Sequence, residues 1–214
     1  ARGRCSERIG GSDAYLPVLE AFDSLLRDLK GTEVVPVMKR VAPTWYAQIA
    51  PLSGESDQSI QLLEEIKDVT QERLKREFVA YLRDSSRSCP LIVFLDDLHW
   101  ADVSTVDLLS FLGGTLGSLN VLVVVTYRPS DMRLSNHTFL KIKPDLQSRG
   151  LCRELLLEFL QEHDVAEFLE LEFPNHRFPR EFSTLIHAKT EGKGRDRRGR
   201  WSMVPRTRAA GNRA

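Results

Sequence analysis

The feature that most constrains this fold is an uninterrupted apolar run that leads directly into two acids. Residues 91–95 read Leu-Ile-Val-Phe-Leu, and Asp96 and Asp97 follow at once. Five apolar residues without alternation are too few for a helix and favour a strand covered on both faces, as in parallel sheets. Ligands of open parallel sheets bind beyond the carboxyl ends of the strands. The run therefore predicts a parallel strand that carries two carboxylates to a binding edge.

A second apolar run follows at the spacing of a β-α-β unit. Residues 119–125 read LNVLVVV, and residues 103–117 between the two runs show helical spacing of leucines and valines. We predict neighbouring parallel strands over 91–95 and 121–126, joined by that helix in a right-handed crossover. Arg128 comes just after the second strand, so it should approach the edge that holds the two acids.

The rest of the chain alternates helices with short strands, which predicts an α/β fold. Residues 1–12 read as a short strand and a turn, and residues 51–59 as a loop. A third short strand is expected over 154–157. Helices are expected after Asp13 and over 33–50, 60–84, 136–148, 163–172 and 179–190.

Two adjacent acids at a strand end have the form of a Walker B motif. In such a site the first acid, here Asp96, holds Mg²⁺ through its water shell, and the second, Asp97, orients the attacking water. Arg128 could read a γ-phosphate through its fork of donors, beside the polar strand end at Thr126. The alternative is structural: the two acids merely end a strand and cap a turn, and Arg128 is solvated.

Two stretches carry a resemblance to a known family. "PLIVFLDDLHWADVSTVDLLSFL" and "LNVLVVVTYRPSD" resemble the ATPase module of STAND-type signal-transducing P-loop ATPases, which are related to AAA domains and occur in bacterial transcriptional regulators. Weaker similarity extends over residues 1–192. The resemblance implies a three-layer, P-loop NTPase-like parallel sheet with a partial C-terminal helical lid.

The resemblance also implies roles and boundaries. Asp96 would coordinate Mg²⁺, Asp97 would be its acidic partner, and Arg128, with Thr126 beside it, would contact ATP. The ATPase core is expected over 1–160 and the start of the lid over 161–192. The partners would be ATP and the other domains of a multidomain regulator. The protein would be cytoplasmic.

The sequence departs from that family at the phosphate loop. No G-x-x-x-x-G-K-[S/T] motif, or Walker A motif, occurs in the 214 residues. We therefore expect that the chain starts after this loop and that it is a poor ATPase alone. A non-catalytic interaction module of a transcriptional regulator is the alternative function.

The C-terminal residues 193–214 differ in composition from the rest. They hold eight basic side chains and one acidic one, a net charge of +7, and little apolar periodicity. A disordered tail, produced by a reading-frame shift, is the expectation. A basic arm that binds nucleic acid is the alternative, although Trp201 is its only aromatic residue.

Several classes are disfavoured by composition. No apolar stretch is long enough to span a membrane. The three cysteines form no C-x-x-C pair and the histidines no H-x-x-x-H pair, so neither a zinc cluster nor a disulfide framework is expected.

Overall fold

The computed structural model describes residues 1–6, 14–28, 34–50, 70–87, 89–179 and 181–190. The chain divides into two compact units, Ala1–Arg153 and Glu154–Ala214, and each is described by itself. The loop predicted over 51–59 and the tail predicted over 193–214 lie outside the described residues.

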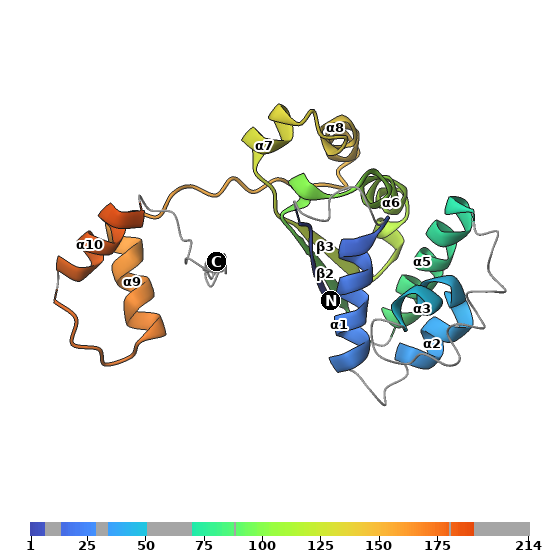
Figure 1. Cartoon of the computed structure of the whole chain (residues 1–214), viewed down its shortest axis with the longest axis horizontal. Coiled ribbons are helices and arrows are strands. Elements are labelled where there is room, and N and C mark those ends of the chain that lie inside the picture. Colours follow the sequence, from blue (N-terminus) through green and yellow to red (C-terminus); the bar gives the residue numbers. More distant parts are fainter. Residues whose placement is uncertain (7–13, 29–33, 51–69, 88, 180, 191–214) are drawn as a thin grey trace, which may run out of the picture. The chain divides into compact units, whose positions relative to one another are not determined.

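The first unit is built on a parallel sheet of three strands in the order β1-β2-β3 (Figure 1). The strands are β1 (Arg2–Arg4), β2 (Leu91–Asp96) and β3 (Val121–Val125). Leu91 lies opposite Val121 and Leu95 opposite Val125. The predicted parallel pairing of the two apolar runs is therefore confirmed, and the sheet places both strand ends at one edge.

The two faces of this sheet have different surroundings. Val93 and Leu95 of β2 belong to the hydrophobic core. On the other face, Ile92 is 56 % exposed and its partner Leu122 is 57 % exposed. The expectation that both faces are covered is thus wrong for the described residues. The apolar run correctly predicted a strand with parallel pairing. Apolar composition alone cannot show whether helices cover the second face of the sheet.

Helix α1 (Leu16–Asp28) packs against β1 and β2 (Figure 1). The approach is close at Gly3, where an added Cβ would lie 1.7 Å from the carbonyl oxygen of Pro17. A glycine is required at this position because any side chain would meet backbone atoms of the helix. The helix and β1 are therefore held in direct contact.

Three further helices pack together beside α1: α2 (Val34–Val41), α3 (Pro43–Ile49) and α5 (Gln71–Ser85). Aromatic rings of α1, α3 and α5 form a cluster there. The ring of Phe78 lies 5.1 Å from that of Phe22 and 4.8 Å from that of Trp45. Pro43 starts α3 and divides the helix predicted over 33–50. Residues 60–69 of the helix predicted over 60–84 lie outside the described part.

The crossover from β2 to β3 runs through helix α6 (Val103–Gly113), as predicted, although the helix is shorter than expected. It ends at Gly113-Gly114, and two short 3₁₀ turns, η1 (Leu98–Trp100) and η2 (Leu116–Ser118), flank it. A glycine pair favours a helix end because the glycine backbone loses more conformational freedom in a helix than that of other residues.

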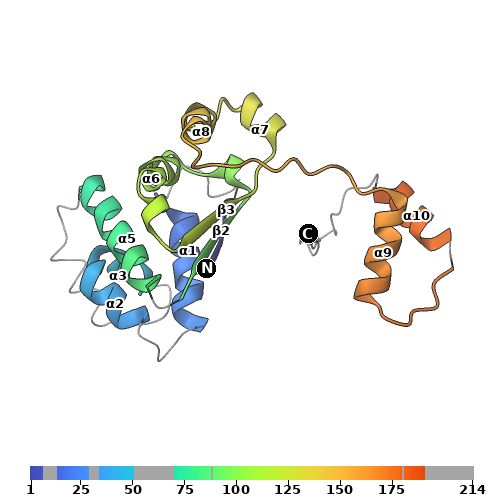
Figure 2. The ribbon, with the colours of Figure 1, turned by 180° about the vertical axis from the view of Figure 1, so that it is seen from behind.

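Two helices follow β3: α7 (Pro129–Leu134) and α8 (Phe139–Ser148). The single helix predicted over 136–148 therefore begins later, and a separate helix precedes it. Asn136 between them has φ 48°, a left-handed conformation that asparagine tolerates. Figure 2 shows these elements from behind.

The second unit contains helices α9 (Glu162–Glu172) and α10 (Glu181–Thr190), which pack on each other and lie where the lid was predicted. Residues 154–157 form no strand, so that prediction is wrong. Leu155, Leu156 and Leu157 are all exposed, and no neighbouring strand pairs with them among the described residues. Apolar composition without a partner strand is not sufficient for a strand. Within the described residues, no helix is long and apolar enough to cross a membrane.

Candidate functional site

Thr126 holds the carboxyl ends of β2 and β3 together. Its hydroxyl donates to Asp96 Oδ1 at 2.6 Å and accepts from the backbone N–H of Asp97 at 3.0 Å. Its carbonyl oxygen accepts from Leu98 N at 2.7 Å, and its own N–H donates to the carbonyl of Leu95 at 3.0 Å. One residue therefore fixes both acids of the motif.

Asp97 takes the turn that ends β2. Its φ and ψ are 58° and 42°, in the left-handed region, which aspartate tolerates better than bulky residues. The turn leads into η1, and the carboxylates of the two acids have different arginine partners. Asp96 Oδ2 accepts from Arg2 Nη2 at 3.1 Å, and Asp97 Oδ2 accepts from Arg4 Nη2 at 3.1 Å.

The Asp96 carboxylate is buried, with its side chain 5 % exposed. Its two oxygens face different partners, the hydroxyl of Thr126 and the guanidinium of Arg2. A buried carboxylate is tolerated when it is paired and hydrogen-bonded. The site therefore stabilises a negative charge and accepts a cation beside Oδ2.

His99 is buried directly behind the acids. Its Nε2 lies 4.0 Å from Asp97 Oδ1 and 3.6 Å from Asp131 Oδ2, and neither ring nitrogen makes a hydrogen bond within the described residues. Burial lowers the pKa of His99 below its ordinary value, and this exceeds the opposite effects of Asp97 and Asp131. The ring is therefore held in its neutral form.

Arg128 lies at the same end of the sheet and is linked to the acids through other residues. Its Nη1 is 3.6 Å from Asp131 Oδ2, the same oxygen that lies 3.6 Å from His99 Nε2. His99 in turn lies 4.0 Å from Asp97. Arg128 immediately precedes α7, whose first residue is Pro129, so the start of that helix positions its backbone.

Cys5 adds no reactive group to this edge. Its N–H donates to the carbonyl of Asp96 at 2.9 Å, and its side chain is buried. Burial, and then the nearby carboxylates, of which Asp102 is the strongest, raise the pKa of its thiol to about 12. Cys5 is therefore a protonated thiol at neutral pH, which disfavours a role as a nucleophile.

No cluster of three or more histidine, cysteine or acidic residues suited to a metal occurs among the residues that the structure describes. A divalent cation at this edge would therefore need ligands besides Asp96 and Asp97. Phosphate oxygens and water are the usual ones for Mg²⁺.

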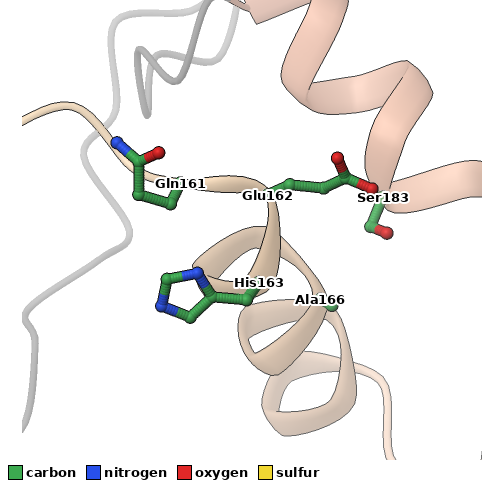
Figure 3. Close-up of a pocket in the computed structure, with 5 residues that line it drawn as sticks. All are labelled: Gln161, Glu162, His163, Ala166 and Ser183. Atoms are coloured by element: carbon green, nitrogen blue, oxygen red, sulfur yellow. The ribbon is translucent and has the colours of Figure 1, made fainter.

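A hollow lies in the other unit, between α9 and α10 (Figure 3). It has a volume of about 410 Å³ and is lined by Gln161, Glu162, His163, Ala166 and Ser183. Glu162 points towards α10 and accepts from the hydroxyl of Thr184, whereas His163 points away from that helix. His163 is exposed, with a side chain 79 % accessible, so the hollow holds no buried ionisable group. We therefore take the sheet edge as the candidate site.

The structure brings Asp96, Asp97 and Thr126 into direct contact and places Arg128 two residues away through Asp131 and His99. Sequence reasoning gave no role to Arg2, Arg4, His99 or Asp131. Alternation in Arg2-Gly3-Arg4 was the available signal for the two arginines, because a strand places residues i and i+2 on one face.

The sequence model of the AAA ATPase domain matches residues 1–124. The chain belongs to the AAA ATPase domain family. The matched residues of this AAA domain contain Asp96 and Asp97 and end just before Thr126 and Arg128. The α/β fold with its parallel sheet agrees with this membership, which implies nucleotide binding. Searches of curated proteins and of solved structures returned no match.

Proposed function

We propose that this AAA domain works as an ATP-gated regulatory switch of the STAND type, in which the edge formed by Asp96, Asp97 and Thr126 reads the phosphates. The single observation that carries the proposal is the bond from Thr126 Oγ1 to Asp96 Oδ1, at 2.6 Å. It ties the acid that ends β2 to the polar residue that ends β3, and so joins two separate strands in one site.

The residues at this edge fit Mg²⁺. Asp96 offers a hard carboxylate oxygen, and the guanidinium beside its Oδ2 shows that the position favours positive charge. When Mg²⁺ is bound, it neutralises charge on the phosphates. Asp96 would hold the ion through its water shell, and Thr126 would keep the carboxylate oriented by its bond to Oδ1.

Asp97 and Arg128 would act on opposite sides of the reaction. Asp97, turned by its left-handed backbone, would orient the attacking water. Arg128 would contact the γ-phosphate with its guanidinium, for which it would leave Asp131. Because Asp131 also lies beside His99, release of Arg128 would change the surroundings of Asp97. Binding of the γ-phosphate by Arg128 would thus alter the surroundings of the acid pair, as a regulatory switch requires.

A signalling role, with other domains of a multidomain bacterial transcriptional regulator as partners, belongs to the same proposal. It rests on the resemblance of residues 90–112 and 119–131 to STAND ATPases.

Nucleotide binding should depend on a phosphate loop, because backbone amides and a lysine hold most of a triphosphate. The 214-residue chain contains no G-x-x-x-x-G-K-[S/T] motif, and carboxylates repel phosphates. We expect calorimetry to find no saturable Mg·ATP binding by this chain. Micromolar binding would contradict this expectation.

The test of the site itself uses the chain extended at its N-terminus by a strand, a Gly-Lys-Ser/Thr phosphate loop and the helix that follows the loop. In that protein, Asp96→Asn should lower ATP hydrolysis far more than Asp102→Asn. Asp102 is the matched control, since it is an acid of the same segment that caps α6 through Thr105 N at 2.9 Å. Equal losses in the two variants would refute the assignment of Asp96.

A further inference from the structure

The geometry points to Arg2 as a tethered cation that competes with the divalent metal ion for Asp96. Arg2 Nη2 donates to Asp96 Oδ2 at 3.1 Å, on the oxygen that Thr126 leaves free. The inference rests on the proposed function, because it assumes that Asp96 is the metal-holding acid, and it adds regulation of that site.

The pairing has an electrostatic reason. A buried carboxylate with no counter-charge is strongly unfavourable, and the side chain of Asp96 is 5 % exposed. The guanidinium of Arg2 supplies that counter-charge within the protein. A guanidinium and a divalent cation repel each other, so they cannot both lie beside Oδ2 at low cost. Binding of the metal ion therefore requires Arg2 to leave.

Arg2 is placed to leave and to return. Its side chain is 62 % exposed, so the guanidinium itself can turn into water with a small loss, and the incoming metal ion then supplies the counter-charge of Asp96. Strand pairing sets Arg2 opposite Phe94, two residues before Asp96, and its guanidinium lies 5.2 Å from the centre of the Phe94 ring. This cation–π contact is made in the same conformation as the ion pair, and it keeps the guanidinium on this face of the sheet.

Arg4 provides a matched control. It lies on the same strand and face as Arg2, and its side chain is 53 % exposed, but its guanidinium pairs with Asp97 Oδ2. Loss of either arginine removes one positive charge near the site. Only loss of Arg2 removes the direct competitor at Asp96, so a difference between the two variants isolates competition from general charge.

The experiment measures Mn²⁺ affinity, with Mn²⁺ as the probe for Mg²⁺, from the free-ion electron paramagnetic resonance signal at low ionic strength. The proteins are the 214-residue chain and its Arg2→Gln, Arg4→Gln and Arg2→Lys variants. Arg2→Gln should bind Mn²⁺ about fivefold to tenfold more tightly than the unaltered chain, which is close to the upper value for an ion pair with one exposed partner. Arg4→Gln should gain less than about twofold, and Arg2→Lys should remain close to the unaltered chain.

A double variant, Arg2→Gln with Asp96→Asn, separates this inference from the function beneath it. The gain should vanish in the double variant. If Arg2→Gln and Arg4→Gln change the affinity equally while Asp96→Asn still weakens binding, competition by Arg2 is wrong and Asp96 remains the metal-holding acid. If Asp96→Asn has no effect in any background, the assignment of Asp96 fails and competition for it fails too. Thermal melting of Arg2→Gln checks that the variant is folded.

Discussion

At the scale of single residues, Thr126 connects the two acids of the site. The hydroxyl of this residue donates to Asp96 and accepts from the backbone of Asp97, so it uses both of its hydrogen-bonding roles within one site. An acid pair at a strand end is only a motif. Thr126 of the neighbouring strand fixes the positions of both acids, because its hydroxyl bonds the Asp96 carboxylate and the backbone N–H of Asp97, whose backbone is left-handed.

Replacement of Thr126 by valine should test this arrangement. Valine has the same shape but no hydroxyl, so the buried carboxylate of Asp96 and the N–H of Asp97 each lose a partner. We expect the free energy of unfolding to fall by about 1–3 kcal/mol. Urea denaturation measures the loss. Thr126→Ser keeps the hydroxyl and should lose much less, so equal stability of the valine and serine variants would contradict the role of the hydroxyl.

The buried imidazole of His99 makes a second prediction at this scale. Burial lowers its pKa below the ordinary 6.5 in the folded chain, so just below that pH the unfolded chain binds more protons than the folded chain. His99 therefore contributes stability that is complete above about pH 6.5 and is lost as the pH falls towards its folded pKa.

His99→Gln should remove this part of the pH dependence. Urea denaturation at about pH 7.5 and about pH 5.5 should show a smaller stability difference in the variant than in the unaltered chain. His163→Gln is the control, since it removes an exposed histidine of α9. The same pH dependence in His99→Gln and the unaltered chain would show that His99 does not titrate with unfolding.

At the scale of elements, the contact between α1 and β1 sets the geometry behind the site. Strand β1 carries both arginines on one face, and its Gly3 faces α1 on the other. The helix backbone at Pro17 leaves no room for a side chain at Gly3. The position of Arg2 and Arg4 relative to the acids therefore depends on the packing of β1 against this helix.

A series of glycine-to-alanine substitutions should rank these contacts. A Cβ at position 3 would lie 1.7 Å from a backbone oxygen, at position 113 it would lie 2.3 Å from the flexible tip of Leu146, and at position 117 it would meet nothing within 4 Å. Gly3→Ala should lower the free energy of unfolding by about 3 kcal/mol or more, Gly113→Ala by less, and Gly117→Ala by about 0.5 kcal/mol or less. Thermal and urea unfolding give the order. A Gly3→Ala protein as stable as Gly117→Ala would mean that α1 can move away from β1.

At the scale of the whole molecule, the site and its supporting core belong to the first unit alone. The core cluster of buried residues, from Cys5 to Phe139, lies within Ala1–Arg153. Helix α9 has buried residues of its own, Val165 and Leu169, whereas the described residues of α10 include no buried one. The described residues therefore assign the acid pair and its partners to one compact unit.

Deletion of residues 154–214 should leave the unfolding of the first unit nearly unchanged. No buried residue of its core cluster is removed, so the melting temperature of residues 1–153 should lie within a few degrees of that of the 214-residue chain, about 2–4 °C per kcal/mol. Differential scanning calorimetry of both proteins makes the comparison. A drop of about ten degrees or more would show that the second unit stabilises the first.

The sequence by itself determined the central β-α-β unit, its parallel direction and the position of the two acids. These follow from local rules: an apolar run of strand length, a helix of crossover length and acids at the strand end are all legible within residues 91–128. The sequence also contains the two glycines that end α6 and the proline that starts α7. The helical spacing of the neighbouring apolar residues nevertheless predicted other helix bounds there.

Only the tertiary structure decided which residues surround the acids. Arg2 lies 94 residues from Asp96, so no local pattern could join these two. The β-α-β pattern predicted Thr126 at the same edge, but its hydrogen bond to Asp96 is evident only in the structure. Side-chain partners across strands depend on register and on the turn at Asp97, both of which are set by packing of the whole unit. For the same reason, three leucines at 155–157 predicted a strand that did not form. A strand requires a partner, and the partner is a property of the fold rather than of the segment.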